Sequence, residues 1–126
     1  MPIYDTAAAA EALGISAKKL DNILSRHALP GIEKKRRGVG RRIGSDAVLA
    51  VFIAVEIVRA AHVPLGVALQ LSRTILMTGG EAMVGRFAVL TIDLAAVRAS
   101  IAARLDAAVE LVGRRPRGRR ASIRVN

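Results

Sequence analysis

Basic side chains are concentrated in two segments of this chain. More than half of its 20 Lys and Arg residues lie at positions 34–42 or 114–124, and neither segment contains an acidic residue. The formal net charge of +10 is therefore focused rather than evenly spread. A focused positive field on a small chain is typical of proteins that bind a polyanion.

The two basic segments differ in their surroundings. In the first, we expect phosphate contacts from Lys34, Lys35, Arg36, Arg37, Arg41 and Arg42, on the backbone or in a narrow minor groove. The second is interrupted by Gly and Pro, which predicts a flexible tail over residues 114–126. Its basic residues are Arg114, Arg115, Arg117, Arg119 and Arg120, and we expect them to form at most an accessory arm.

Polar side chains at helical spacing precede the first basic segment. A helix over residues 17–27, capped by Ser16, would place Lys18, Asn22 and Arg26 on one face. Asn22 suits bidentate contact with adenine, and Lys18 suits the acceptors of guanine. The residues that we expect to contact DNA from this helix are Ser16, Lys18, Lys19, Asn22 and Arg26.

Residue types needed for other chemistry are scarce. The chain has no Cys, only two His, and ten acidic residues that are scattered without a paired-carboxylate arrangement. We therefore expect no catalytic site, no metal and no cofactor. Aromatic residues amount to 2%, which argues against stacking of single-stranded nucleic acid and leaves double-stranded DNA as the expected partner.

The most apolar stretch, residues 47–58, is shorter than the ~20 residues that a membrane span requires. It is interrupted by Glu56 and followed by Arg59, which favours a buried helix. No N-terminal signal peptide is recognisable. We expect a bacterial, cytoplasmic, nucleoid-associated protein with no membrane partner.

Caps, glycines and prolines predict the elements that would position these residues. We expect a first helix over 7–13, capped by Thr6 and stopped by Gly14, and then the helix over 17–27. Two strands from Ile32 to Ile43 would enclose the basic run as a hairpin. Two further helices follow, one from a Ser45 cap to about Ala61 and one from Pro64 to about Met77.

The last third of the chain predicts one strand and one helix. Residues 86–92 are mostly apolar without alternating with polar residues, so both faces of a strand here would be apolar. This is typical of a strand covered on both faces. Its pairing, within the chain or across a dimer, is left open by the sequence. Asp93 would cap an amphipathic helix to Val112, ended by Gly113, whose inward stripe runs through Leu94, Val97, Ile101, Leu105, Ala108 and Val112.

The ordered features of residues 6–76 resemble the DNA-binding domain of the MerR family. The resemblance rests on Ala-Glu-Ala-Leu-Gly-Ile-Ser at 10–16, Ala-Leu-Pro at 28–30, Gly-Arg-Arg-Ile at 40–43 and His-Val-Pro-Leu at 62–65. It implies a winged helix-turn-helix with the second helix in the major groove. The recognition helix here carries Asp21, Asn22 and Ile23 where the family usually has an Arg and aromatic residues.

These observations predict a mainly α fold with a small β component. We expect a winged helix-turn-helix DNA-binding domain over 1–77, a strand plus a dimerisation helix over 78–113, and the basic tail over 114–126. The expected function is a sequence-specific, dimeric transcription regulator. An excisionase-like or architectural DNA-bending factor and a protein-interaction module that does not bind DNA remain alternatives.

Overall fold

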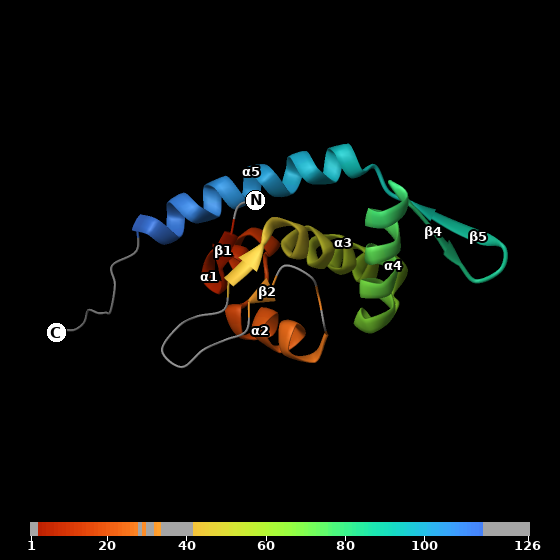
Figure 1. Ribbon diagram of the computed structural model, residues 1–126, viewed down its shortest axis with the longest axis horizontal. Helices are drawn as coiled ribbons and strands as arrows, with labels where there is room; N and C mark the ends of the chain where they lie inside the picture. Colours follow the sequence, from red (N-terminus) through yellow and green to blue (C-terminus); the bar gives the residue numbers. More distant parts are fainter. Residues whose placement is uncertain (1–2, 28, 30–31, 34–41, 115–126) are drawn as a thin grey trace.

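The computed structural model describes residues 3–27, 29, 32–33 and 42–114 (Figure 1). Within these residues the chain is mainly helical, with two small antiparallel sheets. The elements in chain order are β1 (Ile3–Asp5), α1 (Thr6–Leu13), α2 (Ala17–Arg26), β2 (Ile32–Glu33), β3 (Arg42–Gly44), α3 (Ser45–Ala61), α4 (Leu65–Thr78), β4 (Glu81–Val84), β5 (Ala88–Thr91) and α5 (Leu94–Arg114). The expected class, mainly α with a small β component, is confirmed.

Helix α3 forms the centre of the hydrophobic core. Its residues from Ala47 to Ala54 are all buried, because α1, α4, α5 and β3 pack around it. The sequence prediction of a buried helix over residues 47–58 is confirmed for residues 47–54 and Ile57. None of the helices in the described part of the chain is long and apolar enough to cross a membrane.

Helices α1 and α2 are joined by a tight turn at Gly14. Gly14 adopts a left-handed conformation with φ of 72°, which a residue with a Cβ adopts only at a cost. Its N–H donates to Glu11 O, and the N–H of Ile15 donates to Ala10 O. The predicted stop at Gly14 and the Ser16 cap of α2 are both confirmed.

A three-stranded antiparallel sheet, ordered β1–β3–β2, lies beside this helix pair. Ile43 in the central strand is buried and is the register partner of both Tyr4 and Ile32. The pairing of β2 with β3 agrees with the hairpin predicted from Ile32 to Ile43, whose residues 34–41 lie outside the described residues. The sequence does not predict strand β1, because three residues near a chain terminus carry no periodic signal.

Two predicted helix caps are wrong by one residue. Asp5 caps α1, since its carboxylate Oδ1 accepts the N–H of Ala8 at 2.8 Å, and Thr6 is the first helical residue. Gly44 occupies the N-cap position of α3 without a side-chain bond, and Ser45 is helical. In both cases a strand runs directly into the helix, so strand pairing determines where the helix begins.

The strand predicted over 86–92 is shorter, and the prediction that it is covered on both faces is wrong. Residues Ala88–Thr91 form β5, which pairs with β4 of the same chain as an antiparallel hairpin. Helix α4 packs against β4 on one side of this hairpin, and most of β5 is exposed. The hairpin projects from the end of the molecule that α4 forms (Figure 1).

Helix α5 runs along one side of the molecule over α1 and α3 (Figure 1). Asp93 caps it as predicted, since the carboxylate accepts the N–H of Ala96 at 3.1 Å. The helix continues through Gly113 to Arg114, so the predicted end at Gly113 is wrong. Ile101, Leu105 and Ala108 are buried and join the same core as α1 and α3.

Candidate nucleic-acid interface

Helix α2 separates its apolar and polar side chains cleanly. Leu20, Ile23 and Leu24 are buried in the common core. The predicted contact residues Lys18, Lys19, Asn22 and Arg26 are all exposed. Because the apolar stripe fixes the rotation of the helix about its axis, the polar residues at four-residue spacing face outward together.

Ser16 fixes the point at which α2 begins. Its Oγ accepts the N–H of Lys19 at 3.0 Å, and its carbonyl accepts the N–H of Leu20 at 3.0 Å. The amides of the first turn carry the positive end of the helix dipole. Ser16 is exposed, so this helix start is accessible to a ligand.

Arg42 is the only residue of the first basic segment within the described part of the chain. It is exposed at the start of β3, between the two other strands of the sheet. Its register partners are Asp5 on β1 and Glu33 on β2, so both flanking positions are acidic. Arg42 therefore has acidic positions on both sides, which the linear sequence did not indicate.

The other predicted contacts of the wing and tail fall outside the described residues. They are Lys34, Lys35, Arg36, Arg37 and Arg41 in the wing, and Arg115, Arg117, Arg119 and Arg120 in the tail. Arg114 is the last residue of α5. Of the predicted wing, the structure describes only the pairing of β2 with β3, in which Ile32 is the register partner of Ile43.

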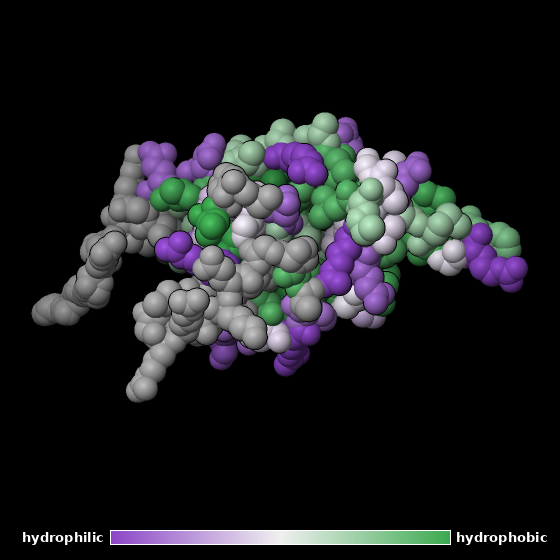
Figure 2. Space-filling model, in the orientation of Figure 1, coloured by the Kyte–Doolittle hydropathy of each residue, from purple (hydrophilic) through white to green (hydrophobic). Residues whose placement is uncertain are grey.

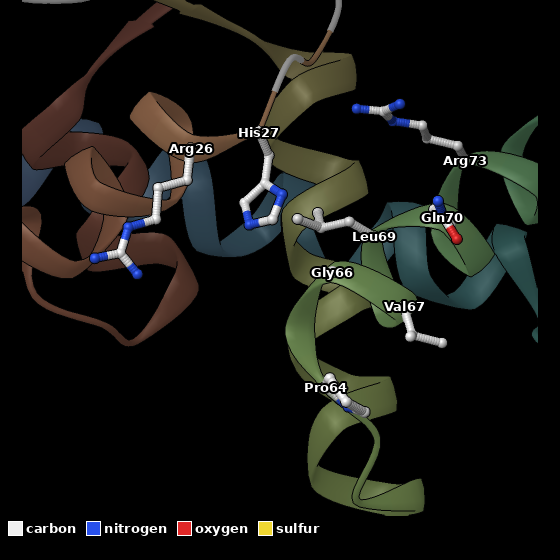
Figure 3. A pocket seen from close by; sticks show the side chains of 8 residues that line it. All are labelled: Arg26, His27, Pro64, Gly66, Val67, Leu69, Gln70 and Arg73. Atoms are coloured by element: carbon white, nitrogen blue, oxygen red, sulfur yellow. The ribbon is translucent and has the colours of Figure 1, made fainter.

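A pocket of about 490 Å³ lies between the end of α2 and the first turns of α4 (Figure 3). The imidazole of His27, at the end of α2, lies close to Gly66 of α4. A Cβ added at Gly66 would be 3.8 Å from His27 Cε1. Arg26 and Arg73 lie on either side of His27, from α2 and α4 respectively (Figure 3). The pocket therefore adds Arg73 and Gln70 to the polar surface beside α2.

Sequence reasoning missed Arg73 because nothing in its spacing connects it to α2. Packing of α4 against α3, together with the close approach of Gly66 to His27, brings the two arginines to one pocket. The sequence offers only the three-residue spacing of Gln70 and Arg73, which are both exposed on α4. Polar pairs at this spacing are common on any solvated helix, so the spacing does not indicate a site.

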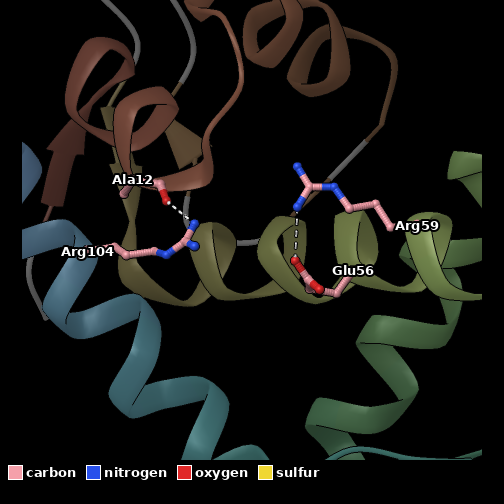
Figure 4. A network of polar contacts seen from close by, with 4 residues as sticks. All are labelled: Ala12, Glu56, Arg59 and Arg104. Atoms are coloured by element: carbon pink, nitrogen blue, oxygen red, sulfur yellow. Dashed lines mark hydrogen bonds and ion pairs between the residues drawn. The ribbon is translucent and has the colours of Figure 1, made fainter.

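Two arginines elsewhere in the structure interact with groups of the same chain. The guanidinium of Arg104 on α5 donates to the carbonyl of Ala12 at 3.3 Å (Figure 4). It also lies 5.5 Å from the ring centroid of Phe52. Arg59 pairs with Glu56 on α3 at 3.4 Å. These interactions give Arg104 and Arg59 roles in the fold, whereas the cations of α2 project from an exposed face.

The described residues contain no group of three or more His, Cys, Asp or Glu side chains that could hold a metal ion. Their two other notable pockets are lined mainly by α5 with α1, or by α5 with the start of α3. The exposed face of α2 and the adjoining pocket together carry Lys18, Asn22, Arg26, Gln70 and Arg73. No protein-family model, curated protein or solved structure matches the chain.

Proposed function

We propose that this chain is a sequence-specific double-stranded DNA-binding transcription regulator that acts as a dimer. In this proposal α1, the Gly14 turn and α2 form a helix-turn-helix, and β2 and β3 form the base of a basic wing. The observation that carries it is the exposed face of α2, where Lys18, Asn22 and Arg26 stand above a fully buried apolar stripe.

The geometry of α2 supports its insertion into a major groove. Helix-turn-helix proteins contact base edges from the N-terminal half of the second helix. Lys18 and Asn22 occupy that half, and both are exposed. Asn22 would accept and donate one hydrogen bond each with adenine, and Lys18 would donate to guanine O6 or N7.

Phosphate contacts would set the register of α2 in the groove. The start of α2 at Ser16 would meet one strand, and Arg26 with Arg73 would meet the backbone at the other end of the helix. The basic run over 34–37 and 41–42 would add the wing contacts. Such contacts supply affinity and salt dependence without reading sequence.

One module of this size buries too little surface for high specificity, so we propose that two copies bind two half-sites. A selected-binding-site experiment followed by footprinting tests this proposal. The expected result is an enriched two-fold symmetric site that the protein protects at moderate salt. Equal binding to random duplexes, or no protected site, would overturn it.

A pair of variants on α2 and in the wing separates base reading from phosphate binding. Asn22→Ala should weaken binding to the selected site by about 1–3 kcal/mol and leave random DNA unaffected. Combined Lys34→Ala, Arg36→Ala and Arg37→Ala should weaken binding to all sequences and reduce the log–log salt slope by about 0.9 for each phosphate that is no longer neutralised. Arg98→Ala, an exposed cation on α5, is the matched control and should leave both unchanged.

The same experiments distinguish the alternatives. Directly repeated sites with strong bending in gel-shift assays would favour an excisionase-like or architectural factor. Unchanged DNA binding in the wing variant would favour the protein-interaction module.

A further inference from the structure

The β4–β5 hairpin exposes large apolar side chains. Met83 and Val89 are cross-strand partners with exposed fractions of 59% and 55%, and Phe87 in the turn is 92% exposed. Met77, at the end of α4 beneath the hairpin, is 87% exposed. In Figure 2 the surface over β4 and β5 is mostly apolar. Apolar patches of this kind on a small protein commonly mark protein interfaces.

One face of the hairpin packs against the core, and the other face is exposed. Ala82 and Leu90 are cross-strand partners on the inner face, where Ala82 is buried and Leu90 is half-buried against the core. Met83 and Val89 alternate with them and therefore project from the outer face. The inner face anchors the hairpin to α4, and the outer face has no covering layer among the described residues.

The base of the hairpin is tightly fixed to α4. Gly79 ends α4 in a left-handed conformation, and the N–H of Ile92 donates to Gly80 O at 2.7 Å. The Thr78 hydroxyl bonds to both the N–H and the carbonyl of Glu81. Gly80 has φ of 141°, and a Cβ there would lie 2.8 Å from Ile92 O. The outer face is therefore presented in a defined orientation.

Helix α5, in contrast, uses its main apolar stripe within the chain. Ile101, Leu105 and Ala108 are buried against α1 and α3. Arg104 adds its bond to Ala12 O on the same side of the helix. A partner that needed this stripe would have to displace α5 from its own core, so the hairpin is the better candidate for an interface.

The charge distribution favours a second copy of this chain as the partner. The chain carries +10, so most of its surface repels another copy. Residues 74–97 contain only Glu81, Arg86 and Asp93 as charged residues, so this stretch lacks the positive excess of the rest. Two copies can therefore approach here without charge repulsion.

We propose that two copies associate through the outer faces of their β4–β5 hairpins, related by a two-fold axis. In a two-fold antiparallel arrangement, the base of one hairpin lies over the turn of the other. Glu81 begins β4 at the base on the outer face, and Arg86 lies in the turn. Each Glu81 then faces Arg86 of the other copy, and Met83 and Val89 supply the apolar centre. The α2 surfaces stay outside the contact.

Sedimentation velocity of the full chain without DNA tests the interface independently of the proposed function. The wild type should sediment as a dimer that dissociates on dilution. Combined Met83→Lys and Val89→Lys should raise the dissociation constant about 100-fold, since desolvating unpaired ammonium groups is strongly unfavourable. Val109→Lys on α5, at a similarly exposed apolar position, is the control and should sediment like the wild type.

Charge reversal tests the two-fold arrangement itself. Glu81→Arg alone and Arg86→Glu alone should each weaken self-association at low salt, because like charges would then oppose each other. Mixing the two single variants should restore a dimer in the proposed antiparallel arrangement.

 In the mixed dimer one copy carries Arg at both 81 and 86 and the other carries Glu at both, so each opposed pair joins an Arg to a Glu. Both positions are exposed, so these variants test the proposal even if the Lys variant does not fold.

A monomer at every concentration would overturn the proposal, as would a dimer unaffected by the paired Lys substitutions. Failure of the mixed variants to associate would exclude the antiparallel two-fold arrangement. A dimer that forms through the hairpin but selects no DNA site would instead overturn the proposed function and leave this interface standing.

Discussion

The α2 surface and the β4–β5 hairpin expose opposite kinds of side chain on one small chain. On α2 the apolar residues Leu20 and Leu24 are buried, and cations and amides face solvent. On the hairpin, Met83 and Val89 face solvent and only the inner face is packed. The two regions lie apart, since the hairpin projects from the α4 end beyond the other helices (Figure 1).

The different side chains exposed on α2 and on the hairpin favour different partners for the two regions. A basic face over a rigid apolar stripe remains hydrated when alone and attracts a polyanion at long range. A two-stranded hairpin is marginally stable on its own, and its apolar outer face gains free energy when a protein surface covers it. We therefore assign DNA to α2 and a second copy of the chain to the hairpin, as proposed above.

The largest effect is expected from a cavity beneath α2. Leu20 is 1% exposed, so Leu20→Ala should lower the free energy of unfolding by about 3–5 kcal/mol through reduced burial and a residual cavity. Val109→Ala, at an exposed apolar position, should change it by less than about 0.5 kcal/mol. Urea denaturation measures both; similar losses would mean that the α2 stripe contributes no more than surface residues.

Strain at the hairpin base should have the next largest effect. Gly80→Ala places a Cβ against Ile92 O and forces a rarely allowed φ, so we expect a loss of about 3 kcal/mol. Gly85→Ala in the turn meets no atom within 4 Å and should cost about 1 kcal/mol from its positive φ alone. Thermal unfolding of the two variants compares them. Equal losses would show that the close approach at Gly80 is relieved by backbone adjustment.

Removing the cap of α2 should have a smaller effect. Ser16→Ala deletes the acceptor for the Lys19 N–H and should cost about 1 kcal/mol. Ser100→Ala, within α5 and exposed, is the control and should be neutral or slightly stabilising because Ala has the higher helix propensity. Urea denaturation followed by circular dichroism measures the pair. A Ser16 variant as stable as the control would show that the cap does not fix the start of α2.

The smallest effect is expected for an exposed ion pair away from both regions. Glu56 and Arg59 on α3 are 3.4 Å apart, and both side chains are more than half exposed. A double-mutant cycle with Glu56→Ala and Arg59→Ala should give a coupling of about 0.3–0.5 kcal/mol that falls with salt. A coupling above about 1 kcal/mol would mean that this ion pair contributes more to stability than exposed pairs usually do.

Much of the helical framework was predictable because local signals and tertiary packing agree. The Gly14 turn, the Ser16 cap and the Asp93 cap all lie where the sequence indicated. The predictions that failed depend on partners distant in sequence. Asp5 rather than Thr6 caps α1 because pairing of β1 with β3 continues to Asp5, and no local pattern contains that pairing.

The candidate site was predictable only on its own helix. Periodicity alone places Lys18, Asn22 and Arg26 on the exposed face of α2, because the apolar stripe determines which side is buried. The position of Arg73 beside Arg26 depends on how α4 packs. The acidic register partners of Arg42 depend on strand order, which its sequence neighbours do not encode.

By itself the sequence determined the helix bounds to within one or two residues, the apolar face of α2 and the segments where positive charge gathers. These follow from neighbours within a few residues. Only the tertiary structure decided whether the apolar residues of β5 and α5 are buried or exposed. The stripe of α5 is buried on its own α1, and the β5 strand is left exposed on one face. Apolar residues gain free energy wherever they meet another apolar surface. Which surface they meet is set by the packing of distant elements.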